Sequence, residues 1–379
     1  MKKKIINITI APDTVDIFLI DIIEYLETHN YDTYIMANEQ ETLDFEYNLK
    51  NKKNFFTHKI SRKLVFFREL KYLFEVYRFF RKNKFDIIHL HTPKILLLFS
   101  IIIKLTNNGK VVGTYHGSLA KKGKYIRNFI FHSLDCLNSF FIDYMFTVNK
   151  NDLERFRKFK LYNHNNSSVI SLSGIGVKSK LFKIISEKEK NQLKEKLGIK
   201  LGSLVIGNVS RFTKDKGIDV IIKVIEELQD KYDLNIIFLH VGSIEDIYYY
   251  NNIKIKNMIS LGFKKQEDLY LYYNLMDLFV FPSLREGFGL SVAEANLCGV
   301  PALVSNIKGL NEVVETGKNG FKIDHFKQYI EYINYYYLNK EELNNLKENT
   351  IEYAQKRFNQ IDSALNTYHI YENLLKKKA

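Results

Sequence analysis

The chain alternates short apolar runs rich in β-branched residues with longer segments of helical periodicity, and this alternation constrains its fold more than any other feature. Six runs in the first half are expected to be strands: 5–10, 33–37, 87–90, 110–115, 144–148 and 169–172. Helical patterns fill the gaps, at 15–28, 64–81, 94–105 and 125–141. Strands that alternate with helices in this way form a parallel sheet covered by crossover helices.

The same pattern starts again after a break at residues 173–177. Strand-like runs follow at 203–209, 234–241, 256–260, 278–281 and 300–304, with helical patterns at 218–229, 267–274 and 290–297. The sequence therefore predicts an α/β protein with two Rossmann-like domains, residues 1–173 and 174–358, that face a central cleft. The segment 359–379 is expected to be a helix that crosses back and packs on the first domain.

Length and composition fit a two-domain protein of the cell interior. The chain has 379 residues, 46% of them hydrophobic, which allows two cores of ordinary size. Its two cysteines, Cys136 and Cys298, are expected to be free thiols in a reducing compartment. The longest apolar run, 95–103, falls short of the roughly 20 residues that a membrane span needs. We expect no signal peptide and a cytoplasmic location.

Positive charge is concentrated in one window of the chain. The net charge is +13, and residues 50–127 hold 19 lysines and arginines against three acids. Within this window, the stretch 68–84 interleaves its cations with five aromatic residues: Tyr72, Phe74, Tyr77, Phe79 and Phe80. This composition favours peripheral contact with an anionic membrane, with the aromatics at the interface. The alternative is that the aromatics pack as core and the lysines are merely solvated.

The richest segment for function is 283–294, which carries Glu286 and Glu294. Gly287 and Gly289 permit a close approach of the backbone to a ligand, and a helix is expected to start at Leu290. The amino terminus of such a helix suits a phosphate, so the amides of residues 288–290 are candidate ligands. Carboxylates beside an anion site suit hydroxyl groups, as on a sugar and a ribose.

Cationic and glycine-bearing loops follow other strands of the second domain. Arg211 and Lys216 lie between a strand and a helix, where they could neutralise a diphosphate without a metal. Gly242 and Phe263 follow two further strands and are candidates for holding a base and a phosphate. In each case ordinary exposed loops remain the alternative.

In the first domain, His116 follows a predicted strand and precedes a glycine, so it could face the cleft. His91 belongs to a turn at the neighbouring strand end, and His89 is expected to be packed. A metal site from these histidines is disfavoured because no carboxylate or cysteine accompanies them. The first strand–helix turn, 11–14, lacks the glycine pattern of dinucleotide-binding enzymes, which argues against a nicotinamide or flavin cofactor.

Residues 282–301, which contain the E-x7-E pattern of Glu286 and Glu294, are similar to the signature segment of the retaining glycosyltransferases of family 4, which have the GT-B fold. Arg211 and Lys216 match that family's phosphate-binding pair, and His116 matches its histidine at the edge of the acceptor domain. Residues 88–94 and 174–177 resemble the subgroup that builds bacterial capsule, exopolysaccharide and lipid-linked glycans. The resemblance covers nearly the whole chain.

The resemblance implies metal-independent transfer of a hexosyl or N-acetylhexosaminyl group from a UDP-linked nucleotide sugar to a glycan or a polyprenyl-diphosphate-linked acceptor. It implies that Glu286 holds the donor sugar, Glu294 holds the ribose, and His116 contacts the sugar from the other domain. Phe288, Gly289 and Leu290 supply backbone amides. The first loop departs from the family's glycine-rich pattern, so Asp13 and Thr14 are its candidate contacts.

Three other functions stay open on the sequence alone. The chain could be a catalytically silent GT-B partner of another transferase, although Arg211, Lys216 and both glutamates are intact. It could be a related GT-B epimerase or phosphorylase, and the latter needs a cofactor lysine that is not identified here. A basic nucleic-acid-binding protein would explain the charge, but no recognised binding motif is present.

Overall fold

A computed structural model describes residues 2–12, 14–39, 54–61, 66–117, 125–162, 165–171, 177–245, 247–251 and 256–376. The chain divides into two compact units. The first comprises Met1–Gly176 together with Gln360–Ala379, and the second comprises Val177–Asn359. The predicted boundary after residue 173 lies within 172–176, outside the described residues.

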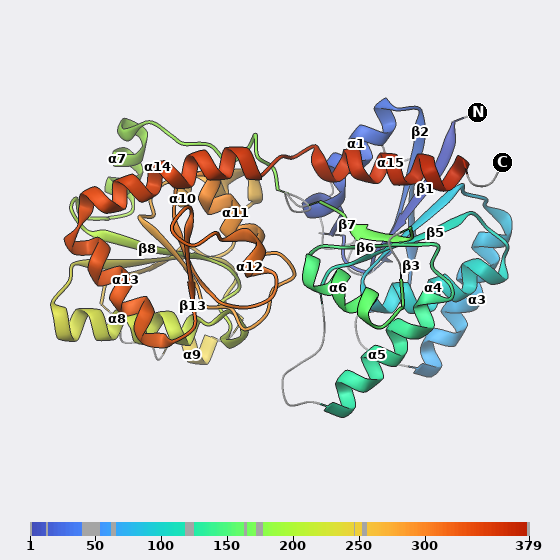
Figure 1. The fold of residues 1–379 in the computed structure, drawn as a ribbon, viewed down its shortest axis with the longest axis horizontal. Helices are drawn as coiled ribbons and strands as arrows, with labels where there is room; N and C mark the ends of the chain where they lie inside the picture. The colour runs from blue at the N-terminus through green and yellow to red at the C-terminus, as the bar shows by residue number, and fades with distance from the viewer. Residues whose placement is uncertain are drawn as a thin grey trace. The chain divides into compact units, whose positions relative to one another are not determined.

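Within the described residues, the first unit is built on a parallel sheet of seven strands in the order β3-β2-β1-β4-β5-β6-β7. The strands are β1 (Lys3–Ile8), β2 (Tyr31–Asn38), β3 (Phe55–His58), β4 (Ile87–His91), β5 (Lys110–Tyr115), β6 (Tyr144–Thr147) and β7 (Ser167–Val169). The chain reverses its direction of travel across the sheet between β1 and β4 (Figure 1). Ligands of such folds bind beside the strand ends at this kind of switch point.

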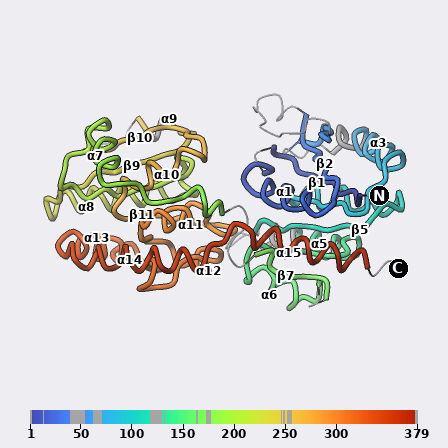
Figure 2. Tube along the Cα trace, turned by 90° about the horizontal axis from the view of Figure 1, so that it is seen from above, coloured from blue at the N-terminus to red at the C-terminus, as the bar shows by residue number. Residues whose placement is uncertain are grey.

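Helices cover both faces of this sheet. They are a π-helical turn η1 (Val15–Leu19), α1 (Ile20–Thr28), α3 (Phe66–Lys82), α4 (Pro93–Leu105), α5 (Tyr125–Ser139), α6 (Lys150–Lys158) and α15 (Asp362–Lys376). The terminal helix α15 runs beside α1, as Figures 1 and 2 both show, and buries Ala364 and Tyr371 in one of the unit's two cores. The C-terminal segment therefore completes the first unit rather than the second.

Within the described residues, the second unit is built on a parallel sheet of six strands in the order β10-β9-β8-β11-β12-β13. The strands are β8 (Leu204–Val209), β9 (Ile236–Val241), β10 (Met258–Ser260), β11 (Leu278–Phe281), β12 (Ala302–Ser305) and β13 (Gly320–Ile323). Its switch point lies between β8 and β11, which pair directly. Large hydrophobic cores on both faces, one under α8 and α13 and the other under α10, α11 and α14, hold these strands in place.

The helical elements of the second unit connect these strands. They are α7 (Glu187–Lys196), η3 (Lys214–Lys216), α8 (Ile218–Tyr232), α9 (Ile247–Asn251), η4 (Gln266–Asp268), α10 (Leu269–Tyr273), α11 (Leu290–Leu297), α12 (Leu310–Val313), α13 (Phe326–Leu338) and α14 (Lys340–Arg357). The α/β class and the two Rossmann-like units confirm the fold predicted from the alternation of strands and helices.

The structure corrects three sequence expectations. Strands β3 and β13 were not predicted, and β13 falls where only loop was expected before the helical C-terminal segment. The expected helix 267–274 is a 3₁₀ turn followed by the short α10. The aromatics of α3 do not all face outward, because Phe80 is fully buried and the ring of Phe79 packs against Phe56.

Two expectations about composition can be compared with the structure directly. Cys136 and Cys298 are free thiols, the first partly buried and the second buried. No helix in the described part of the chain is both long and apolar enough to span a bilayer.

Candidate functional site

The loops that follow β8, β11 and β12 are bound to one another at the carboxyl edge of the second sheet. The backbone N–H of Leu284 donates to the carbonyl oxygen of Asp215 at 2.9 Å, which joins the loop after β11 to the loop after β8. The hydroxyl of Ser305, at the end of β12, donates to the carbonyl oxygen of Ser283 at 2.6 Å. These bonds gather three loops at the switch point, where α/β folds hold their ligands.

Glu286 and Lys216 form the centre of this edge. The Lys216 Nζ lies 2.7 Å from the Glu286 Oε1, and the Ser283 hydroxyl donates to the same oxygen at 2.8 Å. Both charged side chains are mostly shielded from solvent, with 19% and 13% of their surface exposed. The structure thus joins two residues, 70 positions apart, that the sequence placed in one site.

A glycine explains how these two loops approach so closely. Gly217 has a φ of +73°, and a Cβ at this position would lie 2.1 Å from the carbonyl oxygen of Pro282. Any other residue would push the Lys216 loop away from the loop that carries Glu286. Gly217 also precedes α8, so the same residue starts the helix that anchors the loop.

Arg211 lies in the same loop, but its partners are acids rather than a phosphate. Its Nη1 lies 3.1 Å from the Glu245 Oε2, and its Nη2 lies 3.7 Å from the Asp215 Oδ2. All three side chains are substantially exposed, and exposed pairs of this kind contribute about 0–1 kcal/mol. An anion of higher charge could therefore replace Glu245 at small cost. Glu245 was not predicted from the sequence.

The helix α11 begins directly after the Glu286 loop. Its N-cap, Gly289, has a φ of +98° and provides no capping side chain. The Val292 amide donates to the Gly289 carbonyl at 3.0 Å, so the amides of Leu290 and Ser291 are the ones that another acceptor can take. A Cβ on Gly289 would lie 2.5 Å from Leu310. The side chain of Phe288 is buried and packs on Phe358, which leaves only its backbone for a ligand.

Glu294 is buried in α11, with 4% of its surface exposed. Its two carboxylate oxygens accept hydrogen bonds from the Tyr273 hydroxyl at 2.8 Å and from the Gln266 amide at 3.1 Å. Burial raises the pKa of Glu294, while these two hydrogen bonds act in the opposite direction. The environment of Glu294 is therefore far more apolar than that of Glu286.

Tyr273 and Gln266 were missed in the sequence, although Tyr273 lies inside the expected helix 267–274 and Gln266 directly precedes it. Gln266 begins the 3₁₀ turn η4 in the loop that follows β10, only three residues beyond Phe263. The side chain of Phe263 is 75% exposed, so it is free to contact a planar ligand. The Gln266–Glu294 bond brings this loop to the α11 side of the site. No local pattern marks Tyr273, because its role depends on a helix 21 residues away.

Gly242, at the end of β9, fixes the position of the Arg211 loop. Its φ is +151°, and a Cβ there would lie 1.8 Å from the carbonyl oxygen of Ser210. The same carbonyl accepts a hydrogen bond from the His240 ring at 3.0 Å. The amide of Gly242 in turn donates to the Gly262 carbonyl at 2.9 Å, which links the loops after β9 and β10.

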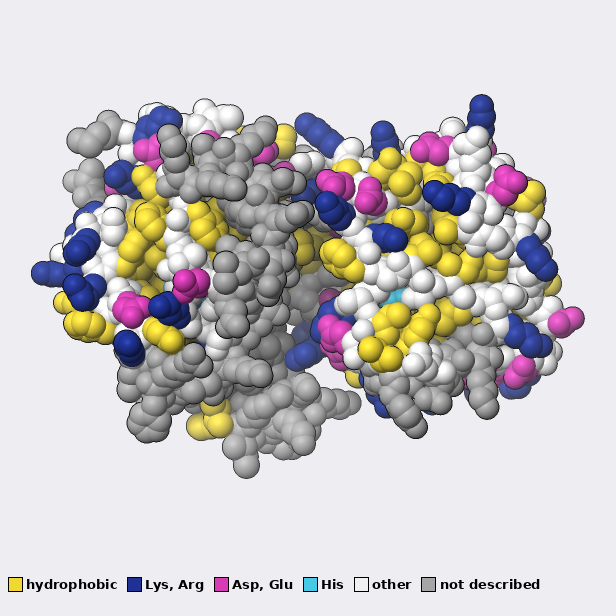
Figure 3. Space-filling model, turned by 180° about the vertical axis from the view of Figure 1, so that it is seen from behind, with side chains coloured by type: hydrophobic (Ala, Val, Ile, Leu, Met, Phe, Trp, Pro, Cys, Tyr) yellow, Lys and Arg dark blue, Asp and Glu magenta, His cyan; other side chains and the backbone are white. Residues whose placement is uncertain are grey.

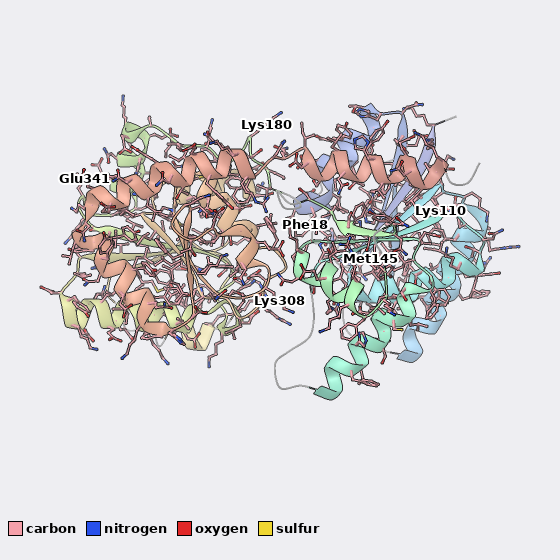
Figure 4. The ribbon with its side chains drawn as sticks, viewed as in Figure 1. Phe18, Lys110, Met145, Lys180, Lys308 and Glu341 are labelled. Carbon is pink, nitrogen blue, oxygen red and sulfur yellow. The ribbon has the colours of Figure 1, made fainter. Side chains whose placement is uncertain are left out.

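In the first unit, His116 lies directly after β5 and beside the end of β4. Its Nε2 is 3.3 Å from the His91 Nδ1, and its ring lies 5.2 Å from that of Phe18, which Figure 4 labels. Burial lowers the pKa of His116 to about 4, so the ring is neutral at physiological pH. A neutral imidazole can donate or accept a hydrogen bond without adding charge.

The neighbours of His116 carry polar atoms that have no partner. His91 approaches the Asn7 Oδ1 at 3.4 Å, and the buried Asn7 Nδ2 and Thr92 Oγ1 have no hydrogen-bond partner among the described residues. Thr92 also has a φ of +72°, a strained value for a threonine. Such orphaned groups beside a switch point mark a polar ligand site, which the sequence indicated only through its histidines.

The remaining candidates of the first unit are His89, Thr14 and Asp13. His89 is fully buried, as expected, with its ring between the Tyr371 hydroxyl at 2.6 Å and the Thr114 hydroxyl at 2.7 Å. Thr14 is nearly buried at the start of the π-helical turn and makes no side-chain capping bond. Asp13 lies outside the described residues.

The described residues contain no group of three histidine, cysteine, aspartate or glutamate side chains arranged to hold a metal ion. The rings of His89, His91 and His116 lie against one another at tilted angles, with ring centres 4.2 Å and 5.6 Å apart. The ring nitrogens of His89 contact two hydroxyl groups, and those of His91 contact the Asn7 amide oxygen and the His116 ring.

Two family models match the chain, and together they cover both units. The model "Glycosyl transferases group 1" matches residues 189–357, and "Glycosyl transferase 4-like" matches residues 7–140. The first match contains Arg211, Lys216, Glu286 and Glu294. The second contains His116.

Similar proteins carry related names. The capsular polysaccharide biosynthesis glycosyltransferase CapM of Staphylococcus aureus is 28% identical over 313 residues, 80% of this chain and 79% of its own. The Escherichia coli UDP-Gal:alpha-D-GlcNAc-diphosphoundecaprenol alpha-1,3-galactosyltransferase is 28% identical over 312 residues, 79% and 78% of the two chains.

Solved structures share the fold over nearly the whole chain. Anabaena HepE in complex with UDP superposes with a TM-score of 0.78 at 18% identity and covers 98% of this chain and 100% of its own. Sucrose-phosphate synthase from Thermosynechococcus elongatus gives a TM-score of 0.80 at 18% identity, with 99% and 100% covered. Taken with the two matching family models, the order of strands in both sheets and the glutamate and cation loops, these likenesses show that the chain belongs to the family 4 glycosyltransferases with the GT-B fold.

Proposed function

We propose that this glycosyltransferase moves a hexosyl or N-acetylhexosaminyl group from a UDP-linked donor to a hydroxyl group of a glycan or polyprenyl-diphosphate-linked acceptor in bacterial surface polysaccharide biosynthesis. The names of its relatives support the UDP-linked donor, the lipid-linked acceptor and the role in surface polysaccharide synthesis. One relative acts in capsule synthesis, and another is named for a UDP-galactose donor and a diphosphoundecaprenol acceptor. HepE, which shares the fold, was solved with UDP and with UDP-glucose.

The observation that carries the proposal is the contact of Lys216 with Glu286 beside the uncapped amino terminus of α11. Lys216, Arg211 and the first amides of α11 place hydrogen-bond donors at one edge of the sheet. The leaving group in this reaction is a nucleoside diphosphate that gains negative charge as its bond to the sugar breaks. Donors fixed in advance near such a charge stabilise the transition state, and this effect often dominates catalysis.

The two glutamates serve different parts of the donor in this proposal. The Oε1 of Glu286 is engaged by Lys216 and Ser283, and its other oxygen is available for sugar hydroxyls. Glu294 is held by Tyr273 and Gln266, and a carboxylate has lone pairs left to accept two hydroxyls of a ribose. Phe263, exposed in the adjoining loop, is suited to stacking on the base.

The same residues argue against a glycosidase-type mechanism, in which one carboxylate acts as nucleophile and another as acid. Glu294 is buried and hydrogen-bonded, and Glu286 is neutralised by Lys216, so neither is presented as a free nucleophile. We propose retention through attack on the same face. The bond from the anomeric carbon to the leaving phosphate oxygen breaks, the acceptor oxygen bonds to that carbon, and the acceptor proton passes to the phosphate oxygen.

The polar side chains around His116 in the first unit are the proposed contacts of the acceptor. His116 is neutral, and the Asn7 and Thr92 side chains beside His91 offer unpaired donors and acceptors. Hydroxyl groups of a sugar match such a set, because each hydroxyl can both donate and accept. We propose that His116 contacts the donor sugar and that its neighbours orient the acceptor.

We further propose that the enzyme works at an anionic membrane surface through the window 50–127. Lys71, Arg78, Arg81 and Lys82 are exposed on α3 and share one face of the helix with the 61% exposed side chain of Phe74. Figure 3 shows lysine and arginine side chains gathering over the side of the first unit where α3 lies. A lipid-linked acceptor would be presented at such a surface.

A thermal-shift titration with UDP and UDP-sugars tests the donor site. At a hundredfold excess over its dissociation constant, a ligand stabilises the folded protein by about 2.7 kcal/mol. Glu286→Gln and Arg211→Ala should each weaken binding of the UDP-sugar at least tenfold, or about 1.4 kcal/mol. Lys223→Ala, an exposed change on α8, should leave it unchanged.

The same titration in EDTA examines the proposed independence from metal, since the cations of the protein should hold the diphosphate alone. Equal shifts in Glu286→Gln, Arg211→Ala and the parent protein would contradict the site. Loss of the shift in EDTA would contradict metal independence while leaving the site in place.

A further inference from the structure

A cavity of about 220 Å³ opens at the edge of the second sheet opposite to the donor site. Its lining residues come from the starts of β8 and β11, from α7, from the end of α13 and from the first turns of α14. Glu341, labelled in Figure 4, marks this first turn of α14. Because β8 has six residues and a strand advances about 3.3 Å per residue, the two sites lie roughly 20 Å apart. No residue of the cavity takes part in the proposed transfer.

The lining of this cavity carries excess positive charge. Lys194, Lys340 and Lys347 face a single carboxylate, Asp277. Asp277 is already engaged, since its Oδ1 lies 2.7 Å from the Lys347 Nζ and its Oδ2 accepts the Val205 amide at 2.9 Å. Among the described residues, no carboxylate lies within ion-pair distance of Lys194 or Lys340. Lys194 is partly buried, and this burial lowers its pKa.

The cavity also contains a buried hydroxyl without a partner. Ser203 is 6% exposed, and its Oγ makes no hydrogen bond to any residue that the structure describes. A buried polar group left unpaired costs about 1–3 kcal/mol, so such a group in a cavity wall points to a missing acceptor. The hydroxyl of Tyr337 accepts the Asn235 amide at 3.2 Å, and its own hydrogen remains to be donated.

We propose that this basic cavity, formed by Lys194, Ser203, Tyr337, Lys340 and Lys347, is an accessory site for the phosphate group of a small metabolite. Two unpaired ammonium groups and two hydroxyl donors match an anion with several acceptor oxygens, and a phosphate is the common anion of this kind. The volume is smaller than the roughly 300–1,000 Å³ of pockets for drug-sized ligands, which excludes a nucleotide sugar. Inorganic phosphate or a short phosphate ester fits.

Occupation of the basic cavity would stabilise the second unit. The ligand would bridge α7, the entry to β8 and α14, which come from separate parts of the chain. A ligand that binds only the folded state stabilises it by mass action. The site therefore links the level of a phosphorylated metabolite to the stability of the unit that carries the donor site, without contact with the reacting sugar.

Isothermal titration calorimetry of the full chain with inorganic phosphate, glycerol 3-phosphate and glycerol tests the site. The two phosphates should bind and glycerol should not. Lys340→Gln and Ser203→Ala should weaken phosphate binding at least tenfold. Lys196→Gln, an exposed change on the same helix as Lys194, should bind as the parent protein does. Tighter binding of glycerol 3-phosphate identifies an organic ester as the ligand, and equal binding identifies free phosphate.

Two further measurements separate this site from the donor site and from misfolding. Ser203→Ala should not lower the melting temperature of the unliganded protein, because its hydroxyl has no partner to lose. Arg211→Ala should retain phosphate binding. Loss of binding in Arg211→Ala with retention in Lys340→Gln would assign the phosphate to the donor site and overturn the proposal. Absence of saturable binding up to about 10 mM phosphate would overturn it as well.

Discussion

At the scale of single residues, two side chains of the same type have different partners and different burial, because different elements surround them. Glu286 forms an ion pair with Lys216, whereas Glu294 is buried in α11 beside Tyr273, where burial raises its pKa. The eight-residue spacing made both glutamates candidates, but only their surroundings separate a carboxylate paired with a cation from one held by neutral donors. This division agrees with separate contacts to a sugar and a ribose.

The histidines show the same effect of surroundings. His58 is 5% exposed, its Nε2 donates to the Thr9 carbonyl at 2.8 Å, and its Nδ1 accepts the Ile60 amide at 3.2 Å. Burial lowers its pKa to about 4, although the bond to Thr9 acts against this shift. His58 therefore binds a proton less readily in the folded protein than in the unfolded chain, where its pKa is about 6.5.

This difference predicts a loss of stability in acid. Above about pH 6.5 neither state is protonated at His58 and the full stability is present. As the pH falls from there toward about 4, only the unfolded state takes up the proton, so stability decreases. At pH 5 this group alone should cost about 2 kcal/mol relative to pH 7. Urea unfolding at the two values should show that His58→Gln removes about this part of the loss.

The exposed His369 on α15 provides the matched control. Between the same two pH values, His369→Gln should lose as much stability as the parent protein does. An undiminished loss in His58→Gln would show that other groups account for the acid sensitivity.

At the scale of elements, the site is made by the loops that leave the parallel strands, and glycines set how closely these loops pack. Gly217 allows the Lys216 loop to reach Pro282, and Gly242 allows the Ser210 carbonyl to lie against the end of β9. The sequence marked Gly242 as a candidate and Lys216, which directly precedes Gly217, as another. It gave no sign of which backbone each one would contact, because those contacts join different strands.

Gly242→Ala should weaken donor binding. The new Cβ would lie 1.8 Å from the Ser210 carbonyl oxygen and would displace the loop that carries Arg211. We expect at least a tenfold higher KM for the nucleotide sugar, measured by steady-state transfer. Gly262→Ala is the control, because Gly262 also has a positive φ, of +65°, but open space around it. Equal KM values in the two variants would show that backbone strain, rather than the displaced loop, is responsible.

At the scale of the whole molecule, charge is divided unevenly between the two units. The window 50–127 belongs to the first unit and holds 19 of the 56 lysines and arginines with three acids. Burial of Phe80 and the packing of Phe79 on Phe56 correct the expectation of a fully aromatic interface. What remains on the outer face of α3 is a set of cations around Phe74, so attraction to a membrane should be mainly electrostatic.

Vesicle flotation measures this attraction. The protein should float with vesicles that contain anionic lipid, and less so with neutral vesicles or at high salt. The triple change Lys71→Gln, Arg78→Gln and Lys82→Gln should reduce recovery, since each cation near an anionic surface contributes about 1 kcal/mol. A control with the same change of charge in the second unit replaces exposed residues Lys188, Lys196 and Lys223. Equal recovery with neutral and anionic vesicles would contradict the membrane proposal.

The sequence by itself determined the class of the fold and most of the chemistry of the candidate site. Periodicity located the inner strands, because a buried parallel strand is a continuous apolar run. It missed β3 and β13, four-residue strands at the sheet edges in which only two residues are apolar. The E-x7-E segment and the cationic loop were visible because their residues are close together along the chain.

Only the tertiary structure decided which of these groups meet. Lys216 and Glu286 are 70 residues apart, and His89 and Tyr371 are 282 apart, yet each pair is in contact. The burial of Glu294, and the unpaired hydroxyl of Ser203 in the basic cavity, likewise depend on helices brought together from distant parts of the chain. Local periodicity fixes which face of an element is apolar, whereas the partner of a polar group is fixed by how the elements pack.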